Sequence, residues 1–207
     1  MNNRRLAKSA CALGLAFCLA APAAAASYSD VPAGSWYAAA VQEVSDKGLM
    51  TGVTDTVFSP TGTVTRSTVI TVLWRLDGSP AATIGERFTD VPEGAWYAAA
   101  ADWAKGKGIA SGNGKGAFEP DAAITREQLA VFLYNYARYK GDAVAEGVLE
   151  QYADESAIHA WAMDGMRHAV GAGLLRGGSD NRLNPTGTAT RAELAVILDR
   201  MMTPVMG

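Results

Sequence analysis

Three arginines occupy corresponding positions in three similar stretches of the chain, and their surroundings indicate anion recognition. Arg66, Arg126 and Arg191 each follow a threonine and precede apolar residues at helical spacing. Threonine is a favoured N-cap, so each arginine is expected at the first position of a helix. An exposed cation there is disfavoured by about 0.3–1 kcal/mol, because the helix dipole is positive at that end. Free N–H groups at a helix start bind anions, and a guanidinium adds a planar fork suited to a carboxylate. The pattern therefore predicts three anion sites.

Three aspartates allow a structural interpretation of the same arginines. Asp30, Asp90 and Asp154 stand at corresponding positions near the start of each stretch. A salt bridge from each arginine to an aspartate would hold the fold together without any ligand. Both interpretations hold together if the aspartate orients the arginine.

Each stretch also carries a tryptophan and a loop glycine at matching positions. These are Trp36, Trp96 and Trp161, and Gly52, Gly112 and Gly177. An indole can stack on the apolar face of a sugar ring or anchor a helix in a core, and without further information core packing is favoured. The glycines supply turn geometry, and they also permit close approach of a ligand to the backbone.

The elements that position these residues come from an internal repeat. Tyr28-Ser29-Asp30-Val31-Pro32 recurs as Phe88-Thr89-Asp90-Val91-Pro92, at an offset of 60. A more diverged third copy runs through Tyr152-Ala153-Asp154 and Trp161, at an offset of 65 from the tryptophan onward. Repeats of this kind bury a common core only by packing on one another.

Each repeat predicts a helix, a glycine-rich loop and a second helix. The first helix is expected from Trp36 to about Lys47, with Gly48 as a left-handed stop that Gly108 and Gly173 repeat. The second helices are expected to start at Thr65, Thr125 and Thr190. Thr190 with Glu193, and Thr125 with Gln128, form capping boxes, whereas Thr68 breaks the box in the first copy.

The second helices share a wide apolar stripe, seen in the first copy as Val69, Ile70, Val72, Leu73 and Leu76. Three such helices can bury their stripes only against each other. We therefore predict an all-α, mainly helical fold, with three helix-loop-helix repeats in pseudo-threefold arrangement around a central three-helix bundle. The expected division is 1–26, 27–87 (repeat 1), 88–148 (repeat 2) and 149–207 (repeat 3).

The first 26 residues have the features of a secretory signal peptide. Arg4, Arg5 and Lys8 precede an apolar run over 9–21, and Pro22 leads into Ala23–Ala26. Cleavage is expected after Ala26. The apolar run is too short to span a bilayer, so we expect an exported chain with no membrane span after cleavage.

Composition disfavours most enzymes and nucleic-acid binders. The chain has 18 Lys and Arg against 21 Asp and Glu, and without residues 1–26 the balance is 15 against 21, a net charge of −6. An acidic chain without a basic run is a poor partner for nucleic acid. The only histidines are His159 and His168, and the only cysteines are Cys11 and Cys18, in the leading segment. We therefore expect no catalytic site, metal or cofactor.

The repeated residues resemble the S-layer homology (SLH) domain family. Its pattern is an aromatic-x-Asp-Val opening, a Trp, a Gly-flanked turn, an aromatic-x-Pro and a Thr-Arg-Ala-Glu helix start. Residues 189–193 match that start fully, 124–128 carry Gln in the Glu position, and 64–68 keep only Thr and Arg. The resemblance covers about Tyr28 to Met202.

The resemblance implies non-covalent attachment to secondary cell-wall polysaccharide, often one with pyruvylated sugars, at the bacterial cell surface. It implies grooves between repeats that use the arginine of each helix start, so that each anion site would take a sugar-borne carboxylate. Peptidoglycan or another envelope protein are further partners to consider. A structural subunit of an S-layer-type lattice, or a protein-interaction subunit, is the alternative. The three sites are expected to be unequal, since Glu127 beside Arg126 would compete with an anionic ligand.

Overall fold

The chain folds into helices joined by long loops. The computed structural model describes residues 28–81 and 87–203, so the predicted signal peptide and its cleavage site at Ala26 lie outside the described residues. Within these ranges there are six α-helices, two short 3₁₀ helices and no strand beyond isolated bridges. The predicted all-α class is confirmed. The helices are α1 (Ala38–Asp46), α2 (Arg66–Leu76), α3 (Ala98–Gly106), α4 (Arg126–Lys140), η1 (Glu155–Ala157), η2 (Ala160–Ala162), α5 (Met163–Gly171) and α6 (Arg191–Met202).

The first helix of each repeat, called here an outer helix (α1, α3, α5), ends where the sequence predicts. Gly48, Gly108 and Gly173 follow these helices with φ of 65°, 68° and 68°, a conformation that costs glycine little. The predicted start is wrong by two residues, since α1 begins at Ala38 and Trp36 lies in the turn before it. The tryptophans therefore precede the outer helices rather than belong to them.

The second helix of each repeat, called here an inner helix (α2, α4, α6), begins at the predicted cap. Both predicted capping boxes are confirmed, Thr125 with Gln128 and Thr190 with Glu193. In repeat 1, the side chain of Thr65 accepts a hydrogen bond from the N–H of Thr68. The capping box is incomplete, because Thr68 has no carboxylate or amide group to accept from the N–H of Thr65. The apolar stripe is buried as expected, with Val69, Ile70, Val72 and Leu73 at most 2% exposed.

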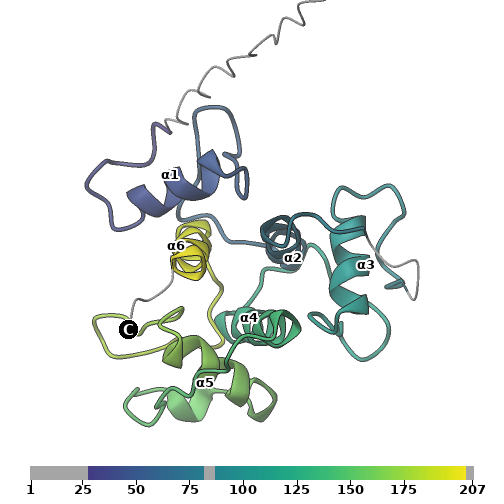
Figure 1. The fold of residues 1–207 in the computed structure, drawn as a ribbon. Coiled ribbons are helices and arrows are strands. Elements are labelled where there is room, and N and C mark those ends of the chain that lie inside the picture. Colours follow the sequence, from purple (N-terminus) through teal and green to yellow (C-terminus); the bar gives the residue numbers. More distant parts are fainter. Residues whose placement is uncertain (1–27, 82–86, 204–207) are drawn as a thin grey trace, which may run out of the picture.

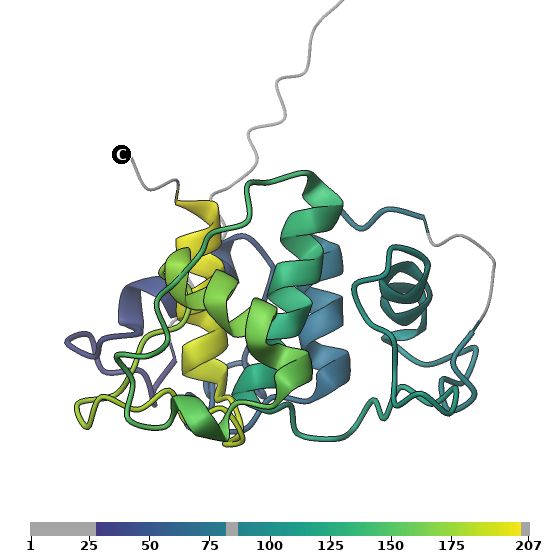
Figure 2. The same ribbon diagram turned by 90° about the horizontal axis from the view of Figure 1, so that it is seen from below.

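The inner helices stand beside one another at the centre, with the outer helices around them (Figures 1 and 2). Each outer helix packs on the inner helix of the preceding repeat: α3 on α2, α5 on α4, and α1 on α6. The last contact joins repeat 1 to repeat 3, so the chain closes on itself. The predicted pseudo-threefold symmetry stays a prediction.

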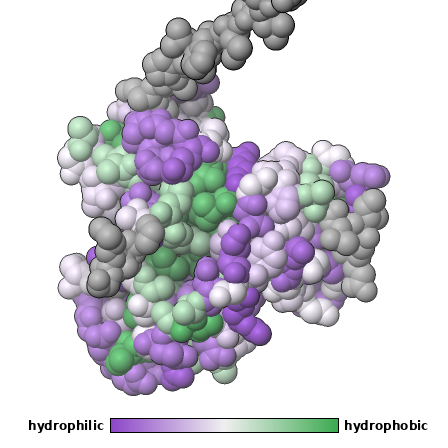
Figure 3. All heavy atoms as spheres, in the orientation of Figure 1, coloured by the Kyte–Doolittle hydropathy of each residue, from purple (hydrophilic) through white to green (hydrophobic). Residues whose placement is uncertain are grey.

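A small ring of backbone hydrogen bonds closes the three repeats just before the inner helices. The N–H of Val64 donates to the carbonyl of Ala189 (3.1 Å), that of Ile124 to Val64 (3.0 Å), and that of Ala189 to Ile124 (3.0 Å). All three residues are at most 1% exposed, so each lost bond would leave a buried polar group unpaired. At the opposite ends of the inner helices, apolar side chains reach the surface at the centre of the molecule (Figure 3).

Candidate functional site

The three predicted aspartates organise the loop that ends each glycine-rich segment. Asp30 accepts hydrogen bonds from the N–H groups of Phe58 (2.8 Å) and Ser59 (2.7 Å). Asp90 binds the corresponding pair in repeat 2, and Asp154 binds Leu183 and Asn184 in repeat 3. The second residue of each pair has a left-handed φ, 61° at Ser59, so the carboxylate stabilises a strained turn.

These hydrogen bonds also affect the pKa of the aspartates. Burial by itself raises the pKa of Asp30 and Asp90, but backbone N–H donors act in the opposite direction and lower it. A neighbouring arginine, Arg191 for Asp30 and Arg66 for Asp90, lowers it further. The pKa of both aspartates therefore lies below its ordinary value.

The motif arginines, defined as Arg66, Arg126 and Arg191, reach across to the neighbouring repeat. The Nε of Arg66 donates to the carbonyl of Phe118 (2.8 Å), that of Arg126 to Leu183 (2.6 Å) and that of Arg191 to Phe58 (2.7 Å). Each carbonyl belongs to a residue whose N–H is held by the aspartate of its own repeat. An arginine and an aspartate from different repeats thus hold one loop residue from two sides.

The predicted salt bridges between motif arginines and aspartates are not formed. No ion pair of the described residues joins Arg66, Arg126 or Arg191 to Asp30, Asp90 or Asp154. The Nε of each motif arginine donates to a backbone carbonyl instead.

The helix starts do not offer free N–H groups, contrary to the prediction. The N–H of Arg66 donates to Ala122 and that of Ser67 to Pro120, while Thr68 donates to the cap Thr65. The same two backbone bonds recur at the other inner helices. Carbonyls of the next repeat therefore occupy the places where an anion would bind.

The motif arginines are also shielded from water. Arg66 and Arg126 are 7% and 8% exposed, and Arg191 is half-buried. The Arg66 guanidinium lies 4.9 Å and 5.1 Å from the ring centroids of Phe118 and Phe132. Burial lowers the pKa of Arg66 and Arg191. These contacts make the arginines structural links between repeats, whatever ligand contacts they also make.

The repeat tryptophans lie at the surface, which makes the core-packing interpretation wrong. Trp36, Trp96 and Trp161 are 66%, 65% and 56% exposed. Trp36 and Trp96 each meet the next residue, a tyrosine, edge to face at 5.2 Å between centroids. Exposed indoles held in place by a second ring are suited to stacking on a sugar. Trp103, by contrast, is 1% exposed in the core.

Repeat 3 supports its tryptophan differently, because it has Ala162 where the other repeats have tyrosine. The ring of His159 stacks on Trp161, at 5.7 Å between centroids and 21° between planes. Glu127, 3% exposed, accepts from the N–H of His159 (3.1 Å) and bonds its Nδ1 (2.8 Å). Glu127 therefore faces His159, and the expectation that it competes for a ligand at Arg126 is wrong.

The loop glycines make room for the aromatic residue that opens each repeat. A Cβ at Gly52 would lie 2.6 Å from Cε1 of Tyr28, and one at Gly177 would lie 2.8 Å from Cε1 of Tyr152. The N–H of Gly52 donates to the hydroxyl of Tyr28 (2.9 Å). Gly112 has a φ of 72°, and a Cβ added there would lie about as close to the carbonyl oxygen of Ala117. The positive φ supports the turn interpretation at Gly112, whereas close packing against the aromatic ring explains the glycine at Gly52 and Gly177.

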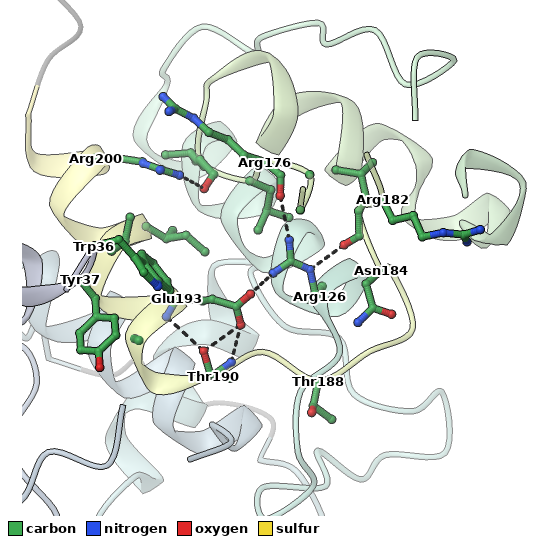
Figure 4. Close-up of a pocket in the computed structure, with 18 of the residues that line it drawn as sticks. Trp36, Tyr37, Arg126, Arg176, Arg182, Asn184, Thr188, Thr190, Glu193 and Arg200 are labelled. Carbon is green, nitrogen blue, oxygen red and sulfur yellow. Dashed lines mark hydrogen bonds and ion pairs between the residues drawn. The ribbon is translucent and has the colours of Figure 1, made fainter. Parts of the chain in front are cut away.

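A groove of about 910 Å³ lies between repeat 3 and repeat 1, and is called here the 3/1 groove (Figure 4). It brings together four predicted site residues from three repeats: Trp36, Arg126, Asp154 and Gly177. The other predicted residues do not line it. Arg176, Arg182, Asn184, Glu193 and Arg200 line it too and were not predicted.

Some of these missed residues differ from their counterparts in the other repeats, which is a signal that the sequence carried. Arg176 stands where repeats 1 and 2 have Thr51 and Ser111, so a comparison of the repeats could have marked it as different. The ion pair between Arg126 and Glu193 joins residues 67 apart and required the tertiary structure.

Two further features of the described residues bear on function. No group of three or more His, Cys, Asp or Glu side chains in residues 28–81 and 87–203 could hold a metal ion. In the same ranges no helix has the length and apolar character needed to cross a bilayer.

Comparison with known proteins finds the same family in all three repeats. The sequence profile of the S-layer homology domain matches residues 27–70, 87–130 and 151–195. The chain is 32% identical over 168 residues to an amylopullulanase of Thermoanaerobacterium thermosulfurigenes, covering 79% of this chain and 9% of that protein. It is 31% identical over 209 residues to a surface-layer 125 kDa protein of Lysinibacillus sphaericus, covering 99% of this chain and 17% of that protein. The chain thus spans less than a fifth of these relatives' length.

Proposed function

Because the chain belongs to the S-layer homology domain family, whose members bind cell-wall polymers at the cell surface, we propose that it attaches to secondary cell-wall polysaccharide. The proposed ligand is an anionic, pyruvylated sugar of that polymer. The family module is a non-catalytic anchor, and this chain matches only that module.

The 3/1 groove is the observation that carries this proposal. An exposed indole, Trp36, stands at one wall of a groove that is otherwise rich in hydrogen-bonding groups. Figure 4 shows Trp36 and Arg200 on one side of the groove, with Arg126 and Arg182 on the other. A sugar has apolar ring faces and polar edges, so stacking on an indole leaves its hydroxyls free for the opposite wall. A groove of this volume accommodates one or two sugar rings at the scale of ordinary ligand pockets.

Local charge supports an anionic ligand despite the acidic chain. Four arginines line the 3/1 groove, against Asp154, Asp180 and Glu193. Long-range attraction to a negative polymer is absent, because the whole chain is net negative. Binding is therefore expected to depend on short-range arginine contacts and to respond only modestly to salt. Exposed Trp96 and Trp161 suggest further weak sites, and several sites on one repetitive polymer gain through effective concentration.

Co-sedimentation with purified cell walls tests the proposal. We expect the protein to pellet with walls, and to stay in solution once the secondary polymer has been stripped from them. Trp36→Ala should weaken the binding, because it removes an exposed stacking surface. Val148→Ala is the matched control, since Val148 is 62% exposed and does not line the groove.

Two results would contradict the polysaccharide proposal. Undiminished binding to stripped walls would point to peptidoglycan or an envelope protein as the partner. Self-assembly without any wall, and no pelleting with walls, would favour the lattice alternative, for which the exposed tryptophans would be contact residues.

A further inference from the structure

Arg126 differs from the other motif arginines in having an acidic partner. Its Nη1 forms an ion pair with Glu193, its Nε donates to the carbonyl of Leu183, and its Nη2 to that of Arg176 (3.2 Å). Glu193 stands where repeats 1 and 2 have the uncharged Thr68 and Gln128. Its other oxygen is held by the N–H and hydroxyl of Thr190. The charge of Arg126 is therefore already neutralised within the protein.

Two other arginines of the 3/1 groove form no ion pair with any residue that the structure describes. Arg176 is exposed on the loop of repeat 3, and Arg200 is half-buried on α6. The Nη1 of Arg200 donates to the carbonyls of Gly173 (3.2 Å) and Leu174 (2.9 Å), which fix the guanidinium but do not cancel its charge. Figure 4 shows the side chains of both arginines at the same end of the groove, above Trp36.

The remaining carboxylates of the groove are engaged elsewhere. Asp154 accepts two backbone N–H groups, and Asp180 lies 3.9 Å from the Nε of Arg182. Burial lowers the pKa of Arg200, the positive charge of Arg176 lowers it further, and the nearby carboxylate of Asp199 opposes part of this shift. Two like charges that repel each other at one end of a groove are stabilised when an anion binds between them.

We infer that the 3/1 groove receives the carboxylate of its ligand at Arg176 and Arg200, with the sugar ring on Trp36, and not at Arg126. The inference rests on the proposed function and specifies one of its sites. Because repeats 1 and 2 have Thr51 and Ser111 at the position of Arg176, this arrangement belongs to the 3/1 groove alone. The anion sites expected in the three repeats are then unequal, because in the 3/1 groove the cationic groups lie on the loop and on α6 and not at the motif arginine.

The other repeats supply matched substitutions. Arg176→Thr introduces the residue of repeat 1 and keeps the backbone carbonyl that Arg126 binds. Arg200→Asn introduces the residue of repeat 2, where the side-chain amide of Asn135 donates to the carbonyl of Ile109 (3.2 Å) in the same way. Both changes therefore remove a positive charge, and each introduces a residue that the same position of another repeat already accommodates. Arg176→Thr alone, at an exposed position, is the variant least able to disturb folding.

The experiment follows the indole N–H signals of Trp36, Trp96 and Trp161 by NMR during titration of the whole purified protein. The probe is a methyl hexoside that carries a pyruvate acetal, and its uncharged methyl ester is the control probe. We expect the charged probe to shift the Trp36 signal. The double variant should weaken that binding about tenfold, since hydrogen bonds to charged groups are lost. Arg176→Thr should weaken it severalfold, and the signals of Trp96 and Trp161 should titrate as before. The ester should bind wild type and double variant alike.

Each contrary outcome identifies what has failed. An unchanged affinity at Trp36 in the double variant, or an equal loss for the ester, would overturn the inference and leave the proposed function standing. A response at Trp96 or Trp161 without one at Trp36 would do the same. If the charged probe shifts none of the three indoles and the protein does not pellet with walls, the proposed function fails and the inference falls with it.

Discussion

Replacing Arg66 by alanine should destabilise the fold, independently of any ligand. The side chain is 7% exposed, and it joins repeat 1 to repeat 2 through the carbonyl of Phe118. It also lies over the rings of Phe118 and Phe132. Alanine removes all of these contacts and leaves a buried carbonyl without its donor.

The expected size follows from these contacts. A hydrogen bond from a charged donor contributes about 1.5–3 kcal/mol, and its loss strands the Phe118 carbonyl. The two ring contacts add about 0.5–1 kcal/mol each. Removing the buried charge offsets part of this loss of stability, because the guanidinium no longer has to be desolvated. We expect a net loss of about 3 kcal/mol in the free energy of unfolding.

Urea unfolding followed by far-ultraviolet circular dichroism measures the effect. With a slope of about 2 kcal/mol per molar urea, the midpoint should fall by about 1.5 M. Arg182→Ala is the control, since this arginine is exposed and its nearest carboxylate contact is 3.9 Å. Its effect should stay within about 0.5 kcal/mol.

A midpoint shift for Arg66→Ala no larger than that of the control would refute the structural role. The outcome also decides how binding data are interpreted. If the expected loss is observed, reduced wall binding by Arg66→Ala reports on folding unless the folded fraction is measured in the same sample.

Three further predictions concern the tryptophans, the caps and acid stability. Trp96→Ala should lower the affinity for walls but change the urea midpoint little, because the indole is 65% exposed. Thr68→Glu should complete the capping box of α2 and raise the free energy of unfolding by about 0.5–1 kcal/mol, read from urea midpoints. Asp30 and Asp90 have a pKa lowered by their N–H donors, so they stabilise the fold above the unfolded value of about 3.9. That stability should be lost as the pH falls below about 4, and urea midpoints at stepped pH values should show a smaller loss in the Asp30→Asn, Asp90→Asn double variant.

Contrary results have definite meanings here as well. Equal wall binding by Trp96→Ala and wild type would remove that indole from the binding surface. A lower midpoint for Thr68→Glu would mean that the added carboxylate meets a neighbour across the repeat boundary. An unchanged acid transition in the double aspartate variant would mean that other groups set it.

The local structure of the repeats could be predicted from the amino-acid sequence. Threonine caps, left-handed glycines and apolar spacing depend on residues within a few positions of each other, so α2, α4 and α6 began where expected. The spacing of the repeats likewise identified the family and the three aspartates that each hold a loop. The tryptophans were found in this way too, although their exposure was not.

The contacts of these residues depend on how the repeats pack, and they could not be predicted from the sequence. The outer helices pack on the inner helix of the preceding repeat, so partners such as Arg191 and Phe58 are 133 positions apart. Spacing along the chain carries no information about a contact that forms when the last repeat closes on the first. For the same reason Glu193 could be recognised as a cap but not as the partner of Arg126. The charged residues that line the 3/1 groove come from repeats 2 and 3, and Trp36 comes from repeat 1, so this site exists only once the ring is closed.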